Sequence, residues 1–234
     1  MFNSVMFVSL GPGEADLVTV KGLKLLQQAD IVFCPSTITS EGKVLSRALN
    51  ILSELGIDRS KIELFDVPMN KDRTKAIESY NNISGKIIEY FKKGIRIAVT
   101  AEGDAGFYSS IHYISDNLSQ AAIPTKRIAG IPAFIACGSL ANIHIAKQEE
   151  ELLVIPGITT YNNLKKNIDN GRSVVIMKPS QCEDIIKEML IGEKDAVFHY
   201  FENAGVPSKE FYTTKKEEIR TRKFPYFSLL IIHK

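Results

Sequence analysis

Short apolar runs alternate with longer helical patterns through the first half of this 234-residue chain. Such alternation predicts an α/β fold with a mostly parallel sheet that helices cover. Asp16 is expected to cap a helix whose apolar stripe includes Val20, Leu23 and Leu26. The strands are expected at 5–10, 31–33, 62–67, 95–100 and 124–128, and further helices at 44–55, at 74–93 and from Phe107 onward.

The second half follows a different pattern. A helix over 132–142 comes first, and 210–214 and 227–232 look like antiparallel strands joined by a charged stretch, 215–223. Between them we expect strands at 151–155, 173–177 and 196–200 and helices at 160–170 and 182–190. This change predicts a second domain with a mixed sheet, so the expected domains are residues 1–129 and 130–234.

Composition and charge exclude several classes of protein. The chain is 44% hydrophobic, which is enough for one sizeable core or two small ones. The net charge of +2 implies neither a nucleic-acid partner nor a membrane partner. The three cysteines form no CxxC pair and the four histidines lack ligand spacing, so we expect neither a metal site nor a disulfide framework. Residues 1–10 lack a basic leader and are too short to span a bilayer, so we expect a cytoplasmic protein.

Two glycine loops follow expected strands. Gly11-Pro12-Gly13 ends the first strand, and glycines there let the backbone approach a ligand at the carboxyl end of a parallel sheet. The third glycine of a GxGxxG motif is missing, which disfavours a dinucleotide fingerprint. A tight strand-to-helix turn is the simpler alternative.

The second loop, 102–109, reads EGDAGFYS and follows the strand at 95–100. A carboxylate there can accept hydrogen bonds from ribose hydroxyls or attract a cationic ligand. The alternative is that Asp104 caps a helix. Small residues are dense from Gly130 to Ser139, which allows a helix to pack closely against a ligand or simply to join two domains.

Taken in order, five segments resemble the signatures of the tetrapyrrole methylase family. They are 11–22 (GPGEADLVTVKG), 102–110 (EGDAGFYSS), 130–134 (GIPAF), 174–178 (VVIMK) and 201–205 (FENAG), and they cover essentially the whole chain. The chain departs from the family at Ala15 and Ala105, where the family commonly has proline. Segments 68–72, 108–114 and 149–157 and the pair Met177-Lys178 resemble the branch that methylates C20 of precorrin-2 or cobalt-factor II in cobalamin biosynthesis.

This resemblance implies two αβα domains with an active-site cleft between them. It implies S-adenosylmethionine as the methyl donor, a tetrapyrrole as the small-molecule substrate, and a homodimer. Methyl transfer from a sulfonium to an electron-rich carbon needs mainly alignment, because the leaving group is neutral and already activated.

The resemblance also assigns candidate site residues by position. The expected contacts of the methyl donor are Pro12, Glu102, Gly103, Asp104, Phe107, Pro132, Ala133, Met177 and Ala204. Asp104 and Tyr108 are hypotheses for a base that removes the C20 proton. Lys71, Arg73, Arg127 and Lys178 are candidates for binding the carboxylates of the substrate.

Other functions stay open at this point. The same fold serves methylation at other tetrapyrrole positions, as in uroporphyrinogen III or another precorrin, and diphthine synthesis on a protein. A nucleotide-binding oxidoreductase is disfavoured by the missing glycine and by the lack of an acidic residue at the ribose distance. A non-catalytic tetrapyrrole carrier would bind the macrocycle without affinity for S-adenosylmethionine.

Overall fold

The computed structural model describes residues 3–38, 41, 43–67 and 74–234. The chain divides into two compact units, Met1–Pro132 and Ala133–Lys234. That 1–129 and 130–234 fold as independent domains stays a prediction, which limited proteolysis of the intact chain would test.

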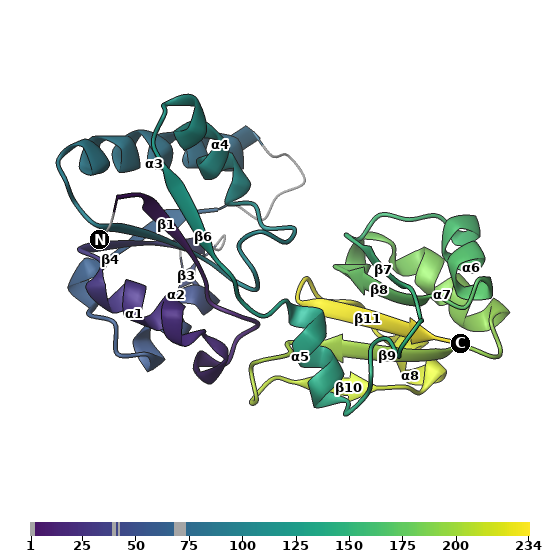
Figure 1. The fold of residues 1–234 in the computed structure, drawn as a ribbon. Coiled ribbons are helices and arrows are strands. Elements are labelled where there is room, and N and C mark those ends of the chain that lie inside the picture. The colour runs from purple at the N-terminus through teal and green to yellow at the C-terminus, as the bar shows by residue number, and fades with distance from the viewer. Residues whose placement is uncertain (1–2, 39–40, 42, 68–73) are drawn as a thin grey trace. The chain divides into compact units, whose positions relative to one another are not determined.

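The first unit is built on a parallel sheet (Figure 1). β2 (Ile31–Ile38) pairs with β4 (Ile62–Asp66) and β5 (Ile97–Ala101), and β1 (Val5–Ser9) lies between β5 and β6 (Thr125–Ile128). All of these pairs are parallel, and the two-residue β3 (Val44–Leu45) adds antiparallel to the end of β2. The predicted mostly parallel sheet is therefore confirmed.

Helices cover both faces of this sheet. Figure 1 shows α1 (Val20–Gln28) and α2 (Arg47–Glu54) on one face, and α3 (Thr74–Lys92) and α4 (His112–Gln120) on the other. Alternate strand residues enter opposite cores, because successive side chains of a strand point to opposite faces. Phe7 and Val99 pack in the core under α3 and α4, whereas Val8 and Ala98 pack under α1 and α2.

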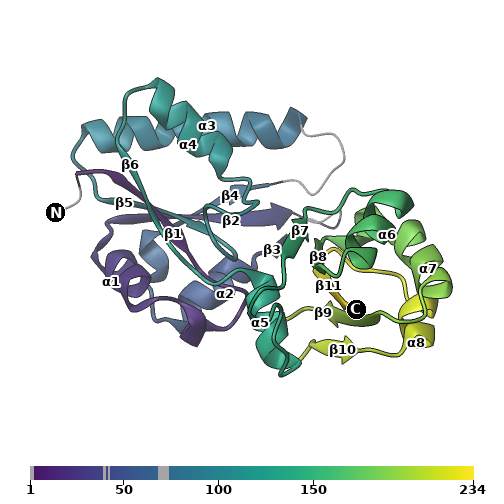
Figure 2. The same ribbon diagram turned by 45° about the vertical axis from the view of Figure 1, so that its right-hand side comes forward.

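The second unit has a mixed sheet in the order β10-β9-β11-β8-β7. β7 and β8 are parallel, and every other neighbouring pair is antiparallel. Figure 2 shows α5 on one side of this sheet and α6, α7 and α8 on the other. The bounds are α5 Ala133–Leu140, β7 Leu152–Ile155, α6 Tyr161–Asp169, β8 Ser173–Met177, α7 Glu183–Gly192, β9 Val197–Glu202, β10 Phe211–Thr213, α8 Lys216–Thr221 and β11 Ser228–His233.

Several local predictions were wrong. Thr19, not Asp16, caps α1, because its hydroxyl accepts the Gly22 N–H at 3.1 Å, while Asp16 lies in a short 3₁₀ helix, Ala15–Leu17. Residues 44–45 are a strand, and α2 begins after Ser46, whose hydroxyl caps it. The helix expected from Phe107 begins at His112, and the charged stretch 215–223 contains the helix α8.

Two further 3₁₀ helices, Arg59–Lys61 and Pro179–Gln181, complete the described elements. None of the helices in the described part of the chain combines the length and the apolar character needed to span a bilayer.

Candidate functional site

The loops after β1 and β5 are joined by a pair of hydrogen bonds between glycines. The Gly11 N–H donates to the Gly103 carbonyl at 3.1 Å, and the Gly103 N–H donates to the Gly11 carbonyl at 2.7 Å. Gly11 has φ +72° and Gly103 has φ +67°, a backbone region that side chains disfavour. The backbone conformation therefore favours glycine at both positions. The two hydrogen bonds hold the loops together.

Ser9 and Asp104 attach the loop after β6 to these two loops. The Ser9 hydroxyl donates to the Ile128 carbonyl at 2.6 Å and accepts the Ala105 N–H at 2.8 Å. Asp104 accepts the Gly106 N–H at 2.8 Å through Oδ1 and the Gly130 N–H at 2.7 Å through Oδ2. Asp104 is thus a bridge between two loops, and the alternative that it caps a helix is wrong.

Six backbone N–H groups at this edge of the sheet are used in internal hydrogen bonds. Besides the amides named above, the Leu10 N–H donates to the Ala101 carbonyl at 2.8 Å. Phosphate sites in dinucleotide-binding folds need such amides free to point at the ligand. We call residues 10–13, 102–106 and 129–130 the loop edge. The loop edge is therefore suited to a ligand that is held through oxygen acceptors and close backbone packing.

Glu102 lies on the same edge, but its carboxyl is engaged by α2. It accepts the Ala48 N–H, and Arg47 lies close enough to stabilise its charge. Burial raises the pKa of Glu102, and these two partners oppose that rise. Burial likewise lowers the pKa of Arg47. Sequence analysis did not single out Arg47, because it lies more than fifty residues from its partner.

The remaining predicted residues of the first unit lie next to these loops. Pro12 is buried between Gly11 and Gly13, and Pro132 is half-buried two residues after Gly130. Phe107 and Tyr108 are in edge-to-face contact, with ring centroids 4.7 Å apart. Tyr108 has φ +50° and is 49% exposed.

In the second unit, Met177 and Ala204 lie at one edge of the mixed sheet. Met177 ends β8, and Ala204 follows the end of β9, which runs in the same direction as β8 because β11 is antiparallel to both. The Asn203 N–H donates to the Phe227 carbonyl at 2.8 Å, which fixes the loop after β9. Ala133 is the first residue of α5.

The basic residues proposed for substrate carboxylates have mixed positions. Arg127 is exposed on β6, with Nη2 3.4 Å from the Ser115 hydroxyl. Lys178 has φ +55°, and its ammonium lies 6.0 Å from the centre of the Tyr226 ring. Lys71, Arg73 and the segment 68–72 lie outside the described residues.

The thiols give no nucleophile. Cys34, Cys137 and Cys182 are unpaired and buried, and burial raises their pKa values to about 11, about 12 and about 11. Among the described residues, no group of three or more His, Cys, Asp or Glu side chains is arranged to hold a metal ion.

Comparison with known proteins gives one consistent family. A sequence profile described as Tetrapyrrole (Corrin/Porphyrin) Methylases matches residues 4–220. A Methanocaldococcus jannaschii protein named probable cobalt-precorrin-2 C(20)-methyltransferase is 26% identical over 99% of this chain and 96% of its own length. A Sinorhizobium precorrin-2 C(20)-methyltransferase is 28% identical over 96% of this chain and 93% of its own.

Solved structures share the fold at lower identity. A cobalt precorrin-4 methyltransferase superposes with a TM-score of 0.74 at 17% identity, covering 99% of this chain and 95% of that one. A uroporphyrin-III C-methyl transferase from Thermus thermophilus, complexed with S-adenyl homocysteine, gives a TM-score of 0.67 at 15% identity over 99% and 97%.

Proposed function

This chain belongs to the tetrapyrrole methylase family, and from that premise we propose that it transfers a methyl group from S-adenosylmethionine to C20 of precorrin-2 or its cobalt form. The observation that carries this proposal is the end-to-end similarity to relatives named for that reaction. Other tetrapyrrole positions and diphthine synthesis are not favoured by those names. The reaction belongs to cobalamin biosynthesis.

The loop edge supports a methyl donor over a dinucleotide. Six of its amides are occupied within the protein, so a pyrophosphate would find fewer donors there. Carboxylate and carbonyl oxygens remain, and these suit a sulfonium and the hydroxyls of a ribose. S-adenosylmethionine, when bound, supplies an activated methyl group with a neutral leaving group. The chain's own task is to orient the two reactants and to exclude water.

We assign the donor contacts to Pro12, Glu102, Gly103, Asp104, Phe107 and Pro132 in the first unit and to Ala133, Met177 and Ala204 in the second. In the first unit, the Gly11–Gly103 bridge and the Asp104 bridge hold these loops in place without the ligand. Such preorganisation lowers the ordering cost of binding.

Calorimetry tests the donor site. S-adenosylmethionine and its demethylated product, added separately to the full chain at high protein concentration, are expected to give saturable heats. NADH, added in a parallel titration, is expected to give none. Absence of any heat with the donor and its product would remove the basis of the proposed function.

Product analysis tests the reaction. Incubation with isotopically labelled S-adenosylmethionine and precorrin-2, with and without cobalt, is expected to give a product heavier by one methyl group in one arm or both. The arm that reacts identifies the natural form of the macrocycle. Methylation of elongation factor instead of either tetrapyrrole would assign the chain to diphthine synthesis.

The base for the C20 proton is tested by two variants. Both oxygens of Asp104 already accept backbone N–H groups, which favours a positioning role for this residue. Tyr108 lies beside the same loop and is 49% exposed. We expect Asp104→Asn to weaken donor binding and Tyr108→Phe to slow single-turnover methylation. If both variants keep wild-type single-turnover rates, neither residue is the base.

We further propose that the protein is a homodimer in solution, as its membership of the family suggests. Light scattering during size-exclusion chromatography measures this directly. A mass of one chain at every concentration would contradict it.

A further inference from the structure

A cavity of about 380 Å³ lies within the second unit, at the end of its sheet away from Met177 and Ala204. Its lining includes Val197 at the start of β9, His199 two residues further along that strand, His233 at the end of β11 and Ser173 at the start of β8. β8 ends at Met177, so roughly 13 Å of strand separates the cavity from that residue at about 3.3 Å per residue. The cavity is therefore distinct from the predicted donor site.

Two imidazoles dominate this cavity. Nδ1 of His199 lies 2.9 Å from the Tyr212 hydroxyl, and Nε2 of His233 lies 3.0 Å from the Ile145 carbonyl. The two rings meet edge to face with centroids 5.3 Å apart. A carbonyl only accepts, so His233 carries its hydrogen on Nε2. The other nitrogens, Nε2 of His199 and Nδ1 of His233, have no hydrogen-bond partner within the described part of the chain.

Basic side chains outnumber acidic ones in the lining. Lys147, Lys234 and His144 join the two imidazoles, and Glu150 is the acidic residue that faces the cavity. Glu150 already accepts the Lys147 N–H at 2.8 Å. The Lys234 ammonium donates to Asp169 at 3.0 Å, outside the lining.

The loop that closes this cavity has an unusual backbone. Asn142 has φ +51° and Gln148 has φ +42°, so two non-glycine residues lie in the left-handed region within seven positions. Such conformations cost free energy and concentrate at ligand sites. The loop places Asn142, His144 and Lys147 around the cavity.

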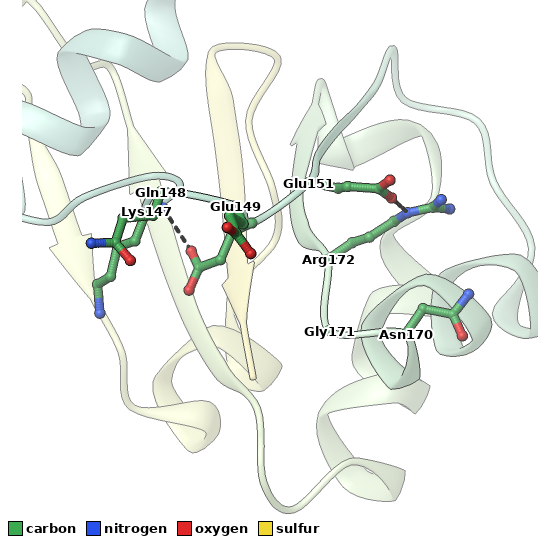
Figure 3. Close-up of a pocket in the computed structure, with 8 residues that line it drawn as sticks. Lys147, Gln148, Glu149, Glu151, Asn170, Gly171 and Arg172 are labelled. Carbon is green, nitrogen blue, oxygen red and sulfur yellow. Dashed lines mark hydrogen bonds and ion pairs between the residues drawn. The ribbon is translucent and has the colours of Figure 1, made fainter.

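A neighbouring cavity of about 510 Å³ differs in chemistry. Figure 3 shows Lys147 at one end of it and Arg172 at the other, with Arg172 paired to Glu151. Glu149 lies between them in the figure, and Glu150 also lines this cavity. Its single guanidinium is thus neutralised, and the histidine-lined cavity is the better site for a negative ligand.

We propose that the histidine-lined cavity binds a small oxyanion, a carboxylate or a phosphate, between His199, His233 and Lys147. The Tyr212 hydroxyl donates to Nδ1 of His199, which leaves the Nε2–H of that ring as a donor to the anion. His233 takes up a proton on Nδ1 when the anion enters, so both imidazoles then donate. Binding is therefore coupled to the uptake of one proton and tightens as pH falls.

The charges around the cavity fit this coupling. Without an anion, burial lowers the pKa of His199 to about 4, and the neighbouring His233 contributes to that lowering. An oxyanion held against the two rings opposes both effects. Glu150, Lys147, Lys234, His144, Tyr212 and Asp169 are the other titratable groups of the surroundings. Glu150 opposes an anion, and so does Asp169, which pairs with Lys234.

The experiment is nuclear magnetic resonance of the full-length protein with ¹⁵N-labelled histidine. Inorganic phosphate and succinate are titrated separately, with chloride holding the ionic strength constant, so that the two arms distinguish a phosphate from a carboxylate ligand. We expect saturable shifts of the His199 and His233 resonances with one or both anions. The succinate affinity at about pH 6.5 should exceed that at about pH 8 by roughly tenfold, for one proton taken up.

Substitutions test which side chains bind the anion. Lys147→Ala, at an exposed position, should weaken binding by roughly tenfold, since it removes one charge-assisted contact. His199→Gln should abolish it. The matched control is His112→Gln in the first unit, where the imidazole bonds the Ser109 carbonyl at 3.0 Å. This variant should bind as the wild type does.

Three outcomes overturn the proposal: no saturable shift with either anion, an affinity that does not change with pH, or equal binding by Lys147→Ala and the wild type. Should His199→Gln fail to fold, Lys147→Ala and the wild-type pH series still decide the question. The measurement needs no methyl transfer, so it stands or falls separately from the proposed function.

Discussion

At the scale of single residues, Gly130 leaves very little space for a side chain. A Cβ atom added there would lie 2.3 Å from the Ser9 Cβ and 3.0 Å from the Gly103 carbonyl oxygen. We expect Gly130→Ala to lower the free energy of unfolding by about 1–3 kcal/mol, as overpacking does. It should also weaken binding of the methyl donor, because Gly103 belongs to the loop edge and Ser9 donates to and accepts from residues next to it. Urea denaturation and calorimetry measure the two effects.

Gly85→Ala is the matched control for this change. Gly85 lies in α3, and an added Cβ atom meets no other atom within 4 Å. The substitution should stabilise the protein by up to about 1 kcal/mol, because alanine is the better helix former. A Gly130→Ala protein as stable as the wild type would mean that the loop edge can open at no cost.

Sequence patterns identified the residues whose roles are local and missed those whose roles depend on distant partners. The glycines at 11 and 103 were singled out, since a strand followed by glycine is visible in the chain. Ser9 was missed, because its hydroxyl bonds Ile128, 119 positions away. Its one visible signal is a polar residue at the end of an otherwise apolar run. The contacts assigned to the methyl donor stay predictions.

At the scale of elements, an ion pair joins β9 to the segment after α8. Arg222 donates to Glu202 through Nε at 2.8 Å and Nη2 at 3.0 Å, and Tyr200 donates to the same carboxylate at 2.9 Å. Arg222→Met should destabilise the protein by about 3–5 kcal/mol, because it leaves a nearly buried carboxylate without its counter-ion. Thermal and urea unfolding measure the loss.

Lys93→Met provides the comparison on the surface. Lys93 pairs with Glu89 one turn earlier, and the two side chains are 60% and 61% exposed. Water already solvates both charges, so the loss should stay below about 0.5 kcal/mol. Equal losses in the free energy of unfolding for the two substitutions would show that burial of Glu202 does not strengthen its ion pair.

The order of strands and helices was predictable because most residues of the buried strands are apolar. The residues at which the elements begin and end were less predictable. α8 was missed because only Ile219 of its six residues is buried, so it has no apolar stripe to detect. The start of α4 was misplaced because the left-handed backbone at Tyr108 keeps 107–111 in turns, and nothing in the residue types requires that conformation.

For the whole molecule, His199 makes stability depend on pH. Its pKa is about 4 in the folded protein, against 6.5 for an ordinary histidine. The unfolded chain therefore takes up this proton first. Stability is unaffected by His199 above about pH 6.5 and falls as pH drops from there to about 4. At 1.36 kcal/mol per pKa unit, the loss reaches at most about 3 kcal/mol.

His199→Gln removes this dependence. The difference in unfolding free energy between wild type and variant, measured by urea denaturation in chloride buffers, should change by up to about 3 kcal/mol between pH 7 and pH 4. A constant difference over that range would show that the imidazole is not held neutral in the folded state.

The three buried thiols can report when the structure around each of them opens. Cys34 lies in the first unit, and Cys137 and Cys182 lie in the second. Each is protonated and shielded until its surroundings come apart, so a thiol reagent marks each cysteine only at the rate of that local event. Mass spectrometry of partly modified protein would then show whether the two halves of the chain loosen together or in turn, without a single engineered label.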